Sequence, residues 1–416
     1  MVSKNAVKLH ELINNCVLLA QRAGPIVRKV QKSGSLNVFQ KGQCPLDVCS
    51  EADLRMQKTL SHNLKELYPN SRIICEEDEQ EMPQHIKPCI QPDQVLKKTE
   101  ARPLFSQELL LNTSRLRRSQ YQKHLNELLE VNPEFMQASD VQRGLYNGFQ
   151  DEFDQNELTF WIDPLDGSSG LAEGHTEHLT VIIGIAVNKR PLLGVVHKPF
   201  YDQGGTPDSK QTRTSRTFIG MPESGLFTVS SQGDNFSKAT ALHVPPCSSD
   251  SQLTDELFKP RICGSHNKNQ RQMNQIITSL GPQSVERVAG SGNKFVHLTE
   301  NKSDYYLNFV PGFKNRDMVG SEAILSSRFG IVTDASKKPI EYCPDSNFTL
   351  KNGIIASKNR EIYQLCQDRI VEQTGISLEM NHHVISTEAF ENKRRRKLEQ
   401  ELSNSINAPA TFVPSL

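Results

Sequence analysis

The chain has 416 residues, and its 48 Lys and Arg residues balance 48 Asp and Glu residues, so its formal net charge is zero. At about 100–200 residues per domain, this length allows two to four domains or one large two-part unit. The zero net charge argues against a generally basic nucleic-acid binder. No stretch approaches the roughly 18 continuous apolar residues of a membrane span. The first residues carry periodic rather than clustered apolar side chains, which argues against a secretory signal.

Nine cysteines are scattered along the chain, and no two of them form a CxxC pair. Their odd number and irregular spacing favour a reducing compartment. The same pattern argues against a disulfide framework and against a zinc-thiolate site. We therefore expect a cytoplasmic protein.

Two helices are predicted near the N-terminus. Apolar residues recur at helical spacing over residues 9–20, and Gly24-Pro25 interrupts or kinks that run. A second helix is expected to begin after Ser50 as its N-cap and to end at Pro69. Asp53 lies three residues after Ser50, in the position of the acid of a capping box.

A short strand is expected at residues 73–75, and the composition changes after it. Residues 80–157 are rich in Gln, Lys, Glu and Pro. One helix ending near Pro133 is suggested by the spacing of Leu116, Tyr121, Leu125 and Leu128. We interpret the segment as a surface insertion that is partly helical and partly disordered.

Regular structure is predicted again from residue 160, where a short strand spans 160–162. The apolar runs 180–187 and 192–196 are joined by polar residues and a proline, which predicts a hairpin. Residues 202–216 are polar and are expected to form a loop. Alternating elements follow, with strands at 305–309, 331–333 and 353–357 and a helix at 321–329.

The end of the chain carries a basic run, Lys393 to Lys397, followed by residues rich in Ser, Asn and Pro. We expect residues 392–416 to form a flexible, solvated tail, because short charge runs are usually solvated. A nuclear address is the alternative.

The sequence WIDPLDGSS at residues 161–169 is the sharpest local feature. An apolar strand leads to Asp163, Pro164 sets the exit turn, and Asp166 follows three residues later. The two carboxylates can face one point beside the free N–H groups of a helix that starts at Ser168-Ser169, where an anion is favoured. Such an arrangement would hold Mg²⁺ and a phosphate together. The alternative is an ordinary surface turn.

Other acidic residues lie at the ends of predicted elements. Glu76-Glu77 closes a strand, Asp317 opens a predicted helix, and Asp53 lies in the first turn of another helix. Each has a simpler individual explanation as a solvated charge, a helix-dipole acid or a capping acid. Their occurrence together favours a shared site.

The order of the motifs resembles a known family of enzymes, the lithium-sensitive, magnesium-dependent phosphatases of the inositol monophosphatase superfamily. Within that superfamily the chain is most similar to the 3'(2'),5'-bisphosphate nucleotidases. The resemblance covers roughly residues 8–79, 158–201 and 260–366. It rests on EAD, EED, WIDPLDGS, GSGNK and RDMVGSEAIL in that order, and on the segments QRAGPIVRKV, HLTVIIGIAV and CGSHNK.

The resemblance implies roles for individual residues. Two or three Mg²⁺ ions would be held by the side chains of Glu76, Asp163, Asp166 and Asp317 and by the carbonyl group of Leu165. Asp53 and the hydroxyl group of Ser168 would polarise the attacking water, and Glu77 would lie near the same metals. The substrate would be contacted by Gly167, Ser168, Cys263, His266, Gly290 and Lys294.

The chain departs from the family pattern at several of these positions. Arg316 stands before the last metal ligand, where the family has Trp, and it could weaken the metal site or point to solvent. Ser168 replaces a more usual Thr, and Cys263-Gly264 replaces the Thr-Arg of the nucleotidases. A proline that usually precedes the Glu of the RDMVGSEAIL segment is absent, and the insertion is longer than expected. None of these changes removes a carboxylate.

Three functions are compatible with these residues. The first is a nucleotidase that hydrolyses the 3'-phosphate of adenosine 3',5'-bisphosphate, with phosphoadenosine phosphosulfate as a second substrate. The second is an inositol polyphosphate 1-phosphatase, and the third is a non-catalytic family member that acts by binding. The complete set of metal-binding motifs favours an active enzyme, and DPLDGS and GSGNK fit the nucleotidases better than the inositol polyphosphate phosphatases. We therefore expect a small phosphorylated nucleotide as the partner, without a membrane or a nucleic-acid polymer.

The fold implied by the resemblance is an α/β protein, a layered αβαβα sandwich of the inositol monophosphatase and fructose-1,6-bisphosphatase type. Its N-terminal α+β metal-binding half would span residues 1–201 and include the insertion at 80–157. Its C-terminal α/β substrate-binding half would span residues 225–380. The active site is expected between the two halves.

Overall fold

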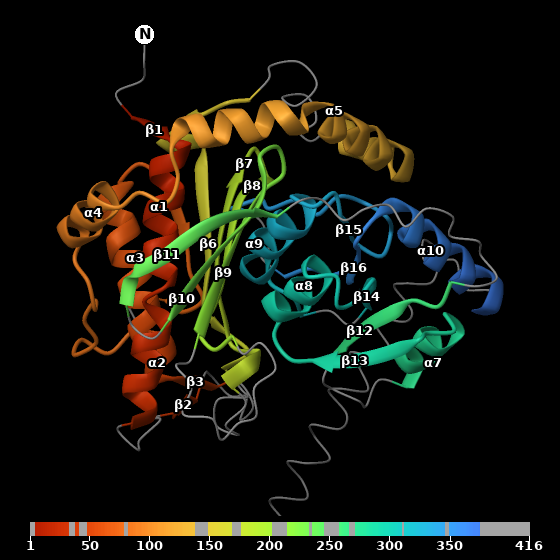
Figure 1. The fold of residues 1–416 in the computed structure, drawn as a ribbon. Helices are drawn as coiled ribbons and strands as arrows, with labels where there is room; N and C mark the ends of the chain where they lie inside the picture. The colour runs from red at the N-terminus through yellow and green to blue at the C-terminus, as the bar shows by residue number, and fades with distance from the viewer. Residues whose placement is uncertain are drawn as a thin grey trace, which may run out of the picture.

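The computed structural model describes residues 5–32, 38–40, 48–78, 82–137, 149–168, 176–201, 214–232, 235–244, 258–265, 271–309, 312–345 and 349–374. Helical and sheet layers alternate across the molecule, with two larger sheets separated by a helical layer and covered by helices on their outer faces (Figure 1). This arrangement confirms the predicted αβαβα sandwich. Among the described residues, no helix combines the length and the apolar content that crossing a membrane requires.

The first helical layer is built from segments whose apolar residues recur at helical spacing. It contains α1 (Leu9–Ala20), α2 (Ala23–Lys32) and α3 (Glu51–Leu67). The predicted capping box at the start of α3 is confirmed. The Asp53 carboxylate accepts a hydrogen bond from the Ser50 N–H group at 2.8 Å, and the Ser50 hydroxyl group accepts one from the Asp53 N–H group at 3.4 Å.

The first large sheet has seven strands in the order β11-β10-β9-β8-β7-β6-β4. β4 runs parallel to β6, and the other neighbours are antiparallel. The predicted hairpin is confirmed as β7 and β8, with Asn188 and Lys189 at positive φ in its tight turn. The strands are β4 (Arg72–Ile74), β6 (Leu158–Asp166), β7 (Thr180–Val187), β8 (Arg190–Lys198), β9 (Thr214–Met221), β10 (Gly225–Gln232) and β11 (Asn235–Val244).

The second half of the molecule contains the middle helices, a five-stranded sheet in the order β13-β12-β14-β16-β15, and the outer helices. Apolar residues of α8 and α9 share a core with both sheets, while α7 and α10 cover the far face of the five-stranded sheet. The helices are α7 (Arg271–Ser279), α8 (Ser291–Thr299), α9 (Asn315–Ser326) and α10 (Arg360–Thr374). The strands are β12 (Arg261–Ser265), β13 (Ser284–Val288), β14 (Tyr305–Asn308), β15 (Ile331–Thr333) and β16 (Ile354–Ser357).

Several short elements complete the described structure. β1 (Ala6–Lys8) pairs with β5 (Glu152–Asp154), and β2 (Val38–Gln40) pairs with β3 (Val48–Ser50). Single helical turns of the 3₁₀ type occur as η1 (Pro133–Gln137), η2 (Gln155–Glu157) and η4 (Thr176–His178).

Some predicted boundaries are corrected. Residues 214–216, expected in a polar loop, begin β9, and the first sheet continues through β11 to Val244 rather than ending with the predicted half at residue 201. The helix predicted at 321–329 begins earlier, as α9 at Asn315. Residues 202–213 and the tail 392–416 lie outside the described residues.

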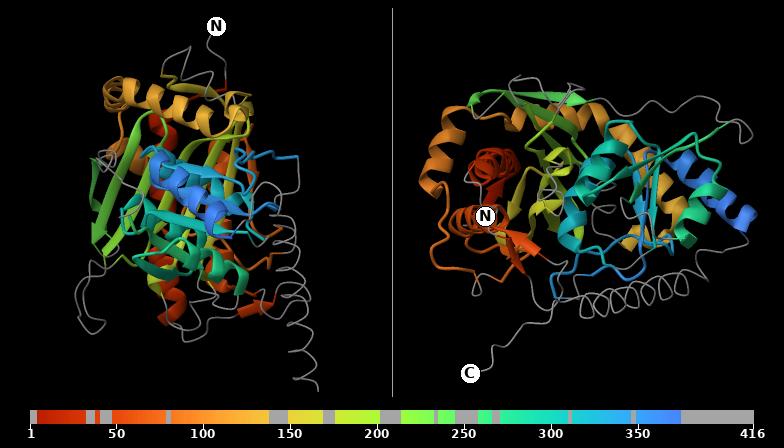
Figure 2. Two further views of the ribbon diagram at one scale, coloured as in Figure 1. Left: turned by 90° about the vertical axis from the view of Figure 1, so that its right-hand side faces the viewer. Right: turned by 90° about the horizontal axis from the view of Figure 1, so that it is seen from below.

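The segment 80–157 is more than a surface insertion. Its helices are α4 (Pro92–Ala101) and α5 (Gln107–Val131), and Val95, Phe105 and Leu110 are buried in the core of the first sheet. Figures 1 and 2 show α5 lying along one end of the layered structure, where Arg117 donates a hydrogen bond to the Ser327 carbonyl group after α9. The predicted helix is confirmed, but Leu116 is 82% exposed and does not share the buried face.

A row of three glycines lets α9 lie directly on the first sheet. Gly184 pairs with Gly194 on the next strand, and Gly194 pairs with Gly220 on the strand after it. A Cβ atom at Gly184 would lie 2.5 Å from the Gly320 nitrogen of α9, and Cβ atoms at the other two glycines would meet the α9 backbone more closely still. The helix can therefore occupy this position only above residues without side chains.

Replacing Gly194 with alanine should lower the free energy of unfolding by about 1–3 kcal/mol, because a methyl group would push α9 off the sheet. Urea denaturation of the Gly194→Ala variant measures the change. Gly24→Ala is the matched control, since a Cβ atom there meets only the end of the flexible Arg28 side chain at 3.2 Å. Equal stability of the two variants would contradict the close packing of α9.

Candidate active site

Two of the acidic residues lie side by side because of the register between β4 and β6. The strands are parallel, and Ile74 pairs with Trp161. Two residues after this pair lie Glu76, just beyond the end of β4, and Asp163, still on β6. Asp163 is 5% exposed, and the nearby Glu76 carboxylate helps to raise its pKa. The sheet thus brings the EED and WIDPLDGS motifs together.

An irregularity at the end of β6 orients both of its aspartates. Asp163 pairs with Ile182, and Asp166 pairs with Thr180. Between these two pairs β6 advances by three residues while β7 advances by two, so β6 contains one additional residue. Pro164 has no N–H group for a regular ladder. The Asp163 carboxylate accepts a hydrogen bond from the Leu165 N–H group at 3.2 Å. β6 therefore continues through the predicted exit turn as a bulged strand.

Asp166 connects this strand to the beginning of α8. Its carboxylate oxygens accept hydrogen bonds from the N–H groups of Ser291 at 3.0 Å and Gly292 at 2.8 Å, and from the Thr180 hydroxyl group at 2.8 Å. A carboxylate at a helix N-terminus is favoured by both the free N–H groups and the helix dipole. Asp166 thereby holds the GSGNK motif against the WIDPLDGS motif.

The two glycines predicted to contact substrate permit this close approach. Gly290 precedes α8 with a φ angle of 75°, and a Cβ atom there would lie 2.9 Å from an Asp166 carboxylate oxygen. Gly167 has a φ angle of 83°, and a Cβ atom there would lie 3.0 Å from the His178 carbonyl oxygen. Both positions require glycine for conformation and for space.

Asp317 reaches the same region from the first turn of α9. Its carboxylate accepts a hydrogen bond from the Lys314 N–H group at 3.0 Å. Burial raises its pKa to about 7, an effect opposed by Arg316 and reinforced by Asp166. Burial also raises the pKa of Asp163, and Glu76, Asp166 and Asp317 raise it further. The carboxylates are therefore close enough to repel one another, and the opposing effect of Arg316 does not offset their burial.

Arg316 points into this group of acids. Its Nη2 donates a hydrogen bond to the Glu76 carboxylate at 2.9 Å, and its Nε lies 3.8 Å from an Asp317 oxygen. The side chain is 18% exposed. Of the two alternatives that the sequence left open for Arg316, solvent exposure is therefore wrong.

The donor set fits a divalent cation by its chemistry, because oxygen ligands and uncompensated negative charge favour a hard metal ion. The side chains nevertheless do not form a tight ligand group as they stand. Within the described ranges, no three His, Cys, Asp or Glu side chains are arranged to hold one ion. Asp166, Asp317 and Glu76 each accept at least one hydrogen bond from a protein donor instead.

The other predicted catalytic residues lie on elements that contact this region. Asp53 is 2% exposed and caps α3, which packs against β6. Glu77 follows Glu76, and its N–H group donates to the Gln57 side chain at 2.9 Å. Gln57 in turn donates to the Glu77 carbonyl group at 2.7 Å. Gln57 was not predicted as a site residue from the sequence. The only indication of its role was that a polar side chain occupies the buried face of α3.

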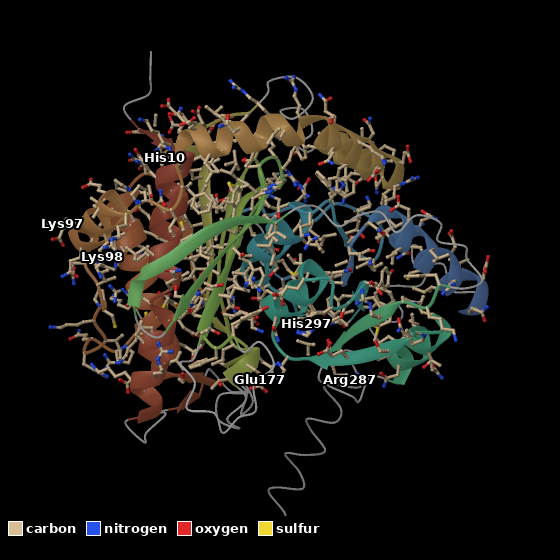
Figure 3. All side chains as sticks on the ribbon, in the orientation of Figure 1. His10, Lys97, Lys98, Glu177, Arg287 and His297 are labelled. Atoms are coloured by element: carbon tan, nitrogen blue, oxygen red, sulfur yellow. The ribbon has the colours of Figure 1, made fainter. Side chains whose placement is uncertain are left out.

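The positions expected to contact a nucleotide have different environments. Lys294 is buried and donates to the Gly290 carbonyl group at 3.0 Å, with burial lowering its pKa. Cys263 is fully buried in the core, and burial raises its pKa to about 12, so its thiol group is not exposed to a ligand. His266 lies outside the described residues. Arg287, labelled in Figure 3, donates to the Ser265 carbonyl group at 3.1 Å and was missed by the sequence analysis.

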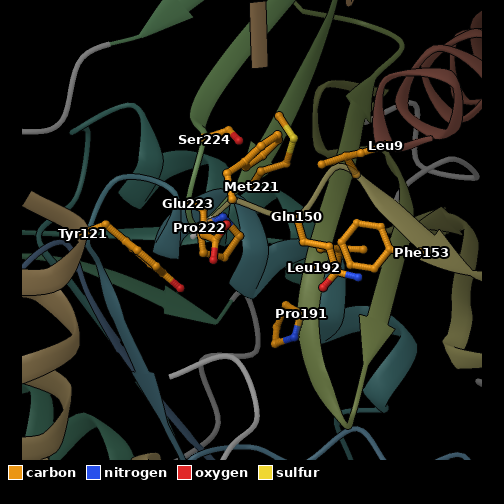
Figure 4. A pocket seen from close by; sticks show the side chains of 11 residues that line it. Leu9, Tyr121, Gln150, Phe153, Pro191, Leu192, Met221, Pro222, Glu223 and Ser224 are labelled. Carbon is orange, nitrogen blue, oxygen red and sulfur yellow. The ribbon is translucent and has the colours of Figure 1, made fainter. Parts of the chain in front are cut away.

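A mainly apolar pocket lies at the other end of the first sheet (Figure 4). It adjoins Pro191 and Leu192 after the β7–β8 turn, whereas the acidic residues lie near Thr180 at the start of β7. Its position separates it from the candidate active site. Other residues lining it are Leu9, Tyr121, Phe153 and Met221.

The chain is similar to known proteins over most of its length. The model of a family described as "Inositol monophosphatase family" matches residues 112–374. The chain is 26% identical to human 3'(2'),5'-bisphosphate nucleotidase 1 over 87% of this chain and 96% of that protein. It is 24% identical to the rat Golgi-resident adenosine 3',5'-bisphosphate 3'-phosphatase over 86% of this chain and 80% of that protein.

Solved structures show the same fold. An IMPase from Thermotoga maritima superimposes with a TM-score of 0.51 at 13% identity, over 87% of this chain and 98% of that one. The suhB protein from Bartonella henselae gives a TM-score of 0.51 at 15% identity, over 88% of this chain and 99% of that one. The resemblance inferred from the motifs is confirmed.

Two substitutions on β6 should separate the structural roles of its aspartates in metal-free protein. Asp166→Asn should lower the free energy of unfolding by about 1–3 kcal/mol, because an amide group cannot satisfy all the donors that Asp166 accepts from. Asp163→Asn should leave the unfolding free energy unchanged or raise it, because it removes a buried repelling charge. Urea denaturation in EDTA measures both unfolding free energies. A larger loss of stability in Asp163→Asn than in Asp166→Asn would contradict the assigned contacts.

Proposed function

The chain belongs to the inositol monophosphatase family, a family of phosphatases, and from this membership we propose that it hydrolyses the 3'-phosphate of adenosine 3',5'-bisphosphate. The products are AMP and inorganic phosphate. Phosphoadenosine phosphosulfate is proposed as a second substrate with the same 3'-phosphate. The names of the human and rat relatives support this substrate class.

The observation that carries the proposal is the meeting of acidic groups from separate elements. Glu76 follows β4, Asp163 and Asp166 end β6, and Asp317 begins α9. Burial and the neighbouring carboxylates raise the pKa values of Asp163 and Asp317, which is typical of a buried region of high negative charge. Divalent cations are suited to this environment, and we propose Mg²⁺ as the cofactor. Asp163, Asp166, Asp317 and the Leu165 carbonyl group are its proposed ligands, and Glu76 lies beside them in contact with Arg316.

A divalent cation at this position would make water a better nucleophile near neutral pH and would neutralise charge on the phosphate. In the hydrolysis, a water oxygen bonds to phosphorus, the P–O3' bond breaks, and the 3' oxygen leaves as a hydroxyl group after receiving a proton. Asp53 and the Ser168 hydroxyl group are proposed to orient this water and accept its proton.

The protein backbone is proposed to hold the transferred phosphate. Gly167 and Ser168 follow the bulged end of β6, where their N–H groups are suited to phosphate oxygens. Gly290 and Lys294 are proposed to adjoin the second phosphate of the substrate. The Lys294 side chain is buried, and its ammonium group donates a hydrogen bond to the Gly290 carbonyl group. Lys294 is therefore suited to act as a fixed positive charge near the substrate rather than as a mobile contact on the surface.

A reducing location, such as the cytoplasm, is the proposed cellular setting. No disulfide is formed by the cysteines whose side chains the structure describes, which are Cys16, Cys75, Cys89, Cys263, Cys343 and Cys366. Disulfides are rare in reducing compartments.

Phosphate release from adenosine 3',5'-bisphosphate tests the proposed reaction. We expect release with Mg²⁺, none with EDTA, and a decrease when Li⁺ is added, because Li⁺ would replace a weakly held Mg²⁺ ion. Inositol 1,4-bisphosphate is the comparison substrate. Release from that compound alone would favour an inositol polyphosphate 1-phosphatase.

The contact between Arg316 and Glu76 favours one other function, a family member that binds its ligand without hydrolysing it. Absence of release from both substrates, in folded protein supplied with Mg²⁺, would support that alternative and contradict the proposed reaction.

Replacing Asp163 with asparagine should abolish phosphate release while leaving the folded structure intact, because the change removes a central carboxylate but keeps the side-chain shape. Activity and circular dichroism measure the two effects. Asp93→Asn is the matched control, since Asp93 is an exposed acid in the first turn of α4 that pairs with Lys97. Retention of most activity by Asp163→Asn would contradict its proposed role.

A further inference from the structure

Arg316 provides a positive charge inside the candidate metal site. Its guanidinium group donates to Glu76 at 2.9 Å, and the two side chains are only 18% and 20% exposed. Its Nε is 3.8 Å from Asp317, which is too long for a hydrogen bond. Arg316 therefore hydrogen-bonds to the acid that follows β4 and makes only a longer ion pair with its neighbour on α9.

The start of α9 explains why Arg316 takes this direction. Asp317 turns back to cap the helix through the Lys314 N–H group. The Lys314 side chain is engaged elsewhere, donating to the Thr349 hydroxyl group at 2.5 Å. Successive helical residues point in different directions, so Arg316 can extend across to β4 while Asp317 remains at the helix end.

A guanidinium group in this position competes with a metal ion. Arginine keeps its charge at all physiological pH values, has no lone pair for coordination, and cannot act as a Lewis acid. It attracts the Glu76 carboxylate and repels a second cation at the same place.

We propose that Arg316 is a built-in cation that takes the place of one divalent ion beside Glu76. The site then binds one ion fewer than it would without this arginine, and Glu76 is a partner of Arg316 instead of a metal ligand. The proposal rests on the metal-dependent function proposed above. It changes the role of Glu76 that the family resemblance implies.

Counting bound Mn²⁺ tests the proposal without substrate. Metal-free protein is titrated with Mn²⁺, and the loss of the electron paramagnetic resonance signal of free Mn²⁺ gives the number of ions per chain. The Arg316→Met variant should bind one more Mn²⁺ ion than the unmodified protein. Adding Glu76→Gln to Arg316→Met should remove that additional ion, whereas Glu76→Gln alone should leave the count of the unmodified protein unchanged.

Arg72→Met is the matched control, because Arg72 lies on β4 and pairs with the exposed Asp345 at 2.6 Å. Its Mn²⁺ count should equal that of the unmodified protein. An unchanged count in Arg316→Met, or loss of an ion in Glu76→Gln alone, would overturn the proposal. Loss of an ion in Glu76→Gln alone would overturn the proposal even if Arg316→Met does not fold.

The same samples separate this inference from the proposed function. Phosphate release together with an unchanged Mn²⁺ count in Arg316→Met would overturn the role of Arg316 and leave the nucleotidase proposal standing. In the opposite case, the variants would bind the predicted numbers of Mn²⁺ ions, but no phosphate would be released from adenosine 3',5'-bisphosphate. This result would support the role of Arg316 and contradict the proposed reaction.

Discussion

The close contact between α9 and the first sheet is the constraint on which the site depends. Gly184, Gly194 and Gly220 remove the side chains that would otherwise separate helix and sheet. On the same helix, the buried Glu322 carboxylate pairs with Arg190 of β8 and accepts a hydrogen bond from Tyr342. Since α9 is fixed against the sheet along its length, its first turn is held near the end of β6. The position of Asp317 follows from this packing.

The acidic groups are held by donors of different kinds. Asp166 accepts hydrogen bonds from the beginning of α8, Asp317 caps its own helix, and Glu76 pairs with Arg316. These contacts orient the carboxylates, although burial raises the pKa of Asp317 and so disfavours its ionised form. The protein thus compensates part of the negative charge by itself. A cation is needed only for the remainder.

Local patterns in the sequence predicted local structure correctly. The Ser50–Asp53 capping box and the β7–β8 hairpin each depend on residues that are close in the chain. The motifs also identified the acidic residues, because their order resembles a known family. The glycine row could not be predicted, since its members lie on three strands and their significance depends on a helix that comes much later. The direction of Arg316 likewise depends on a contact between the start of α9 and Glu76, 240 residues earlier in the chain, which composition and spacing do not determine.

The central claim is that a protein cation and a metal ion share one acidic site. Anomalous X-ray diffraction from crystals grown with Mn²⁺ tests it most directly, because it locates each ion relative to the named side chains. We expect an anomalous peak beside Asp163 and Asp166. We expect the Arg316 guanidinium group to remain bound to Glu76, with no peak between Arg316 and Glu76. A Mn²⁺ ion coordinated by Glu76, with Arg316 displaced towards solvent, would contradict the account.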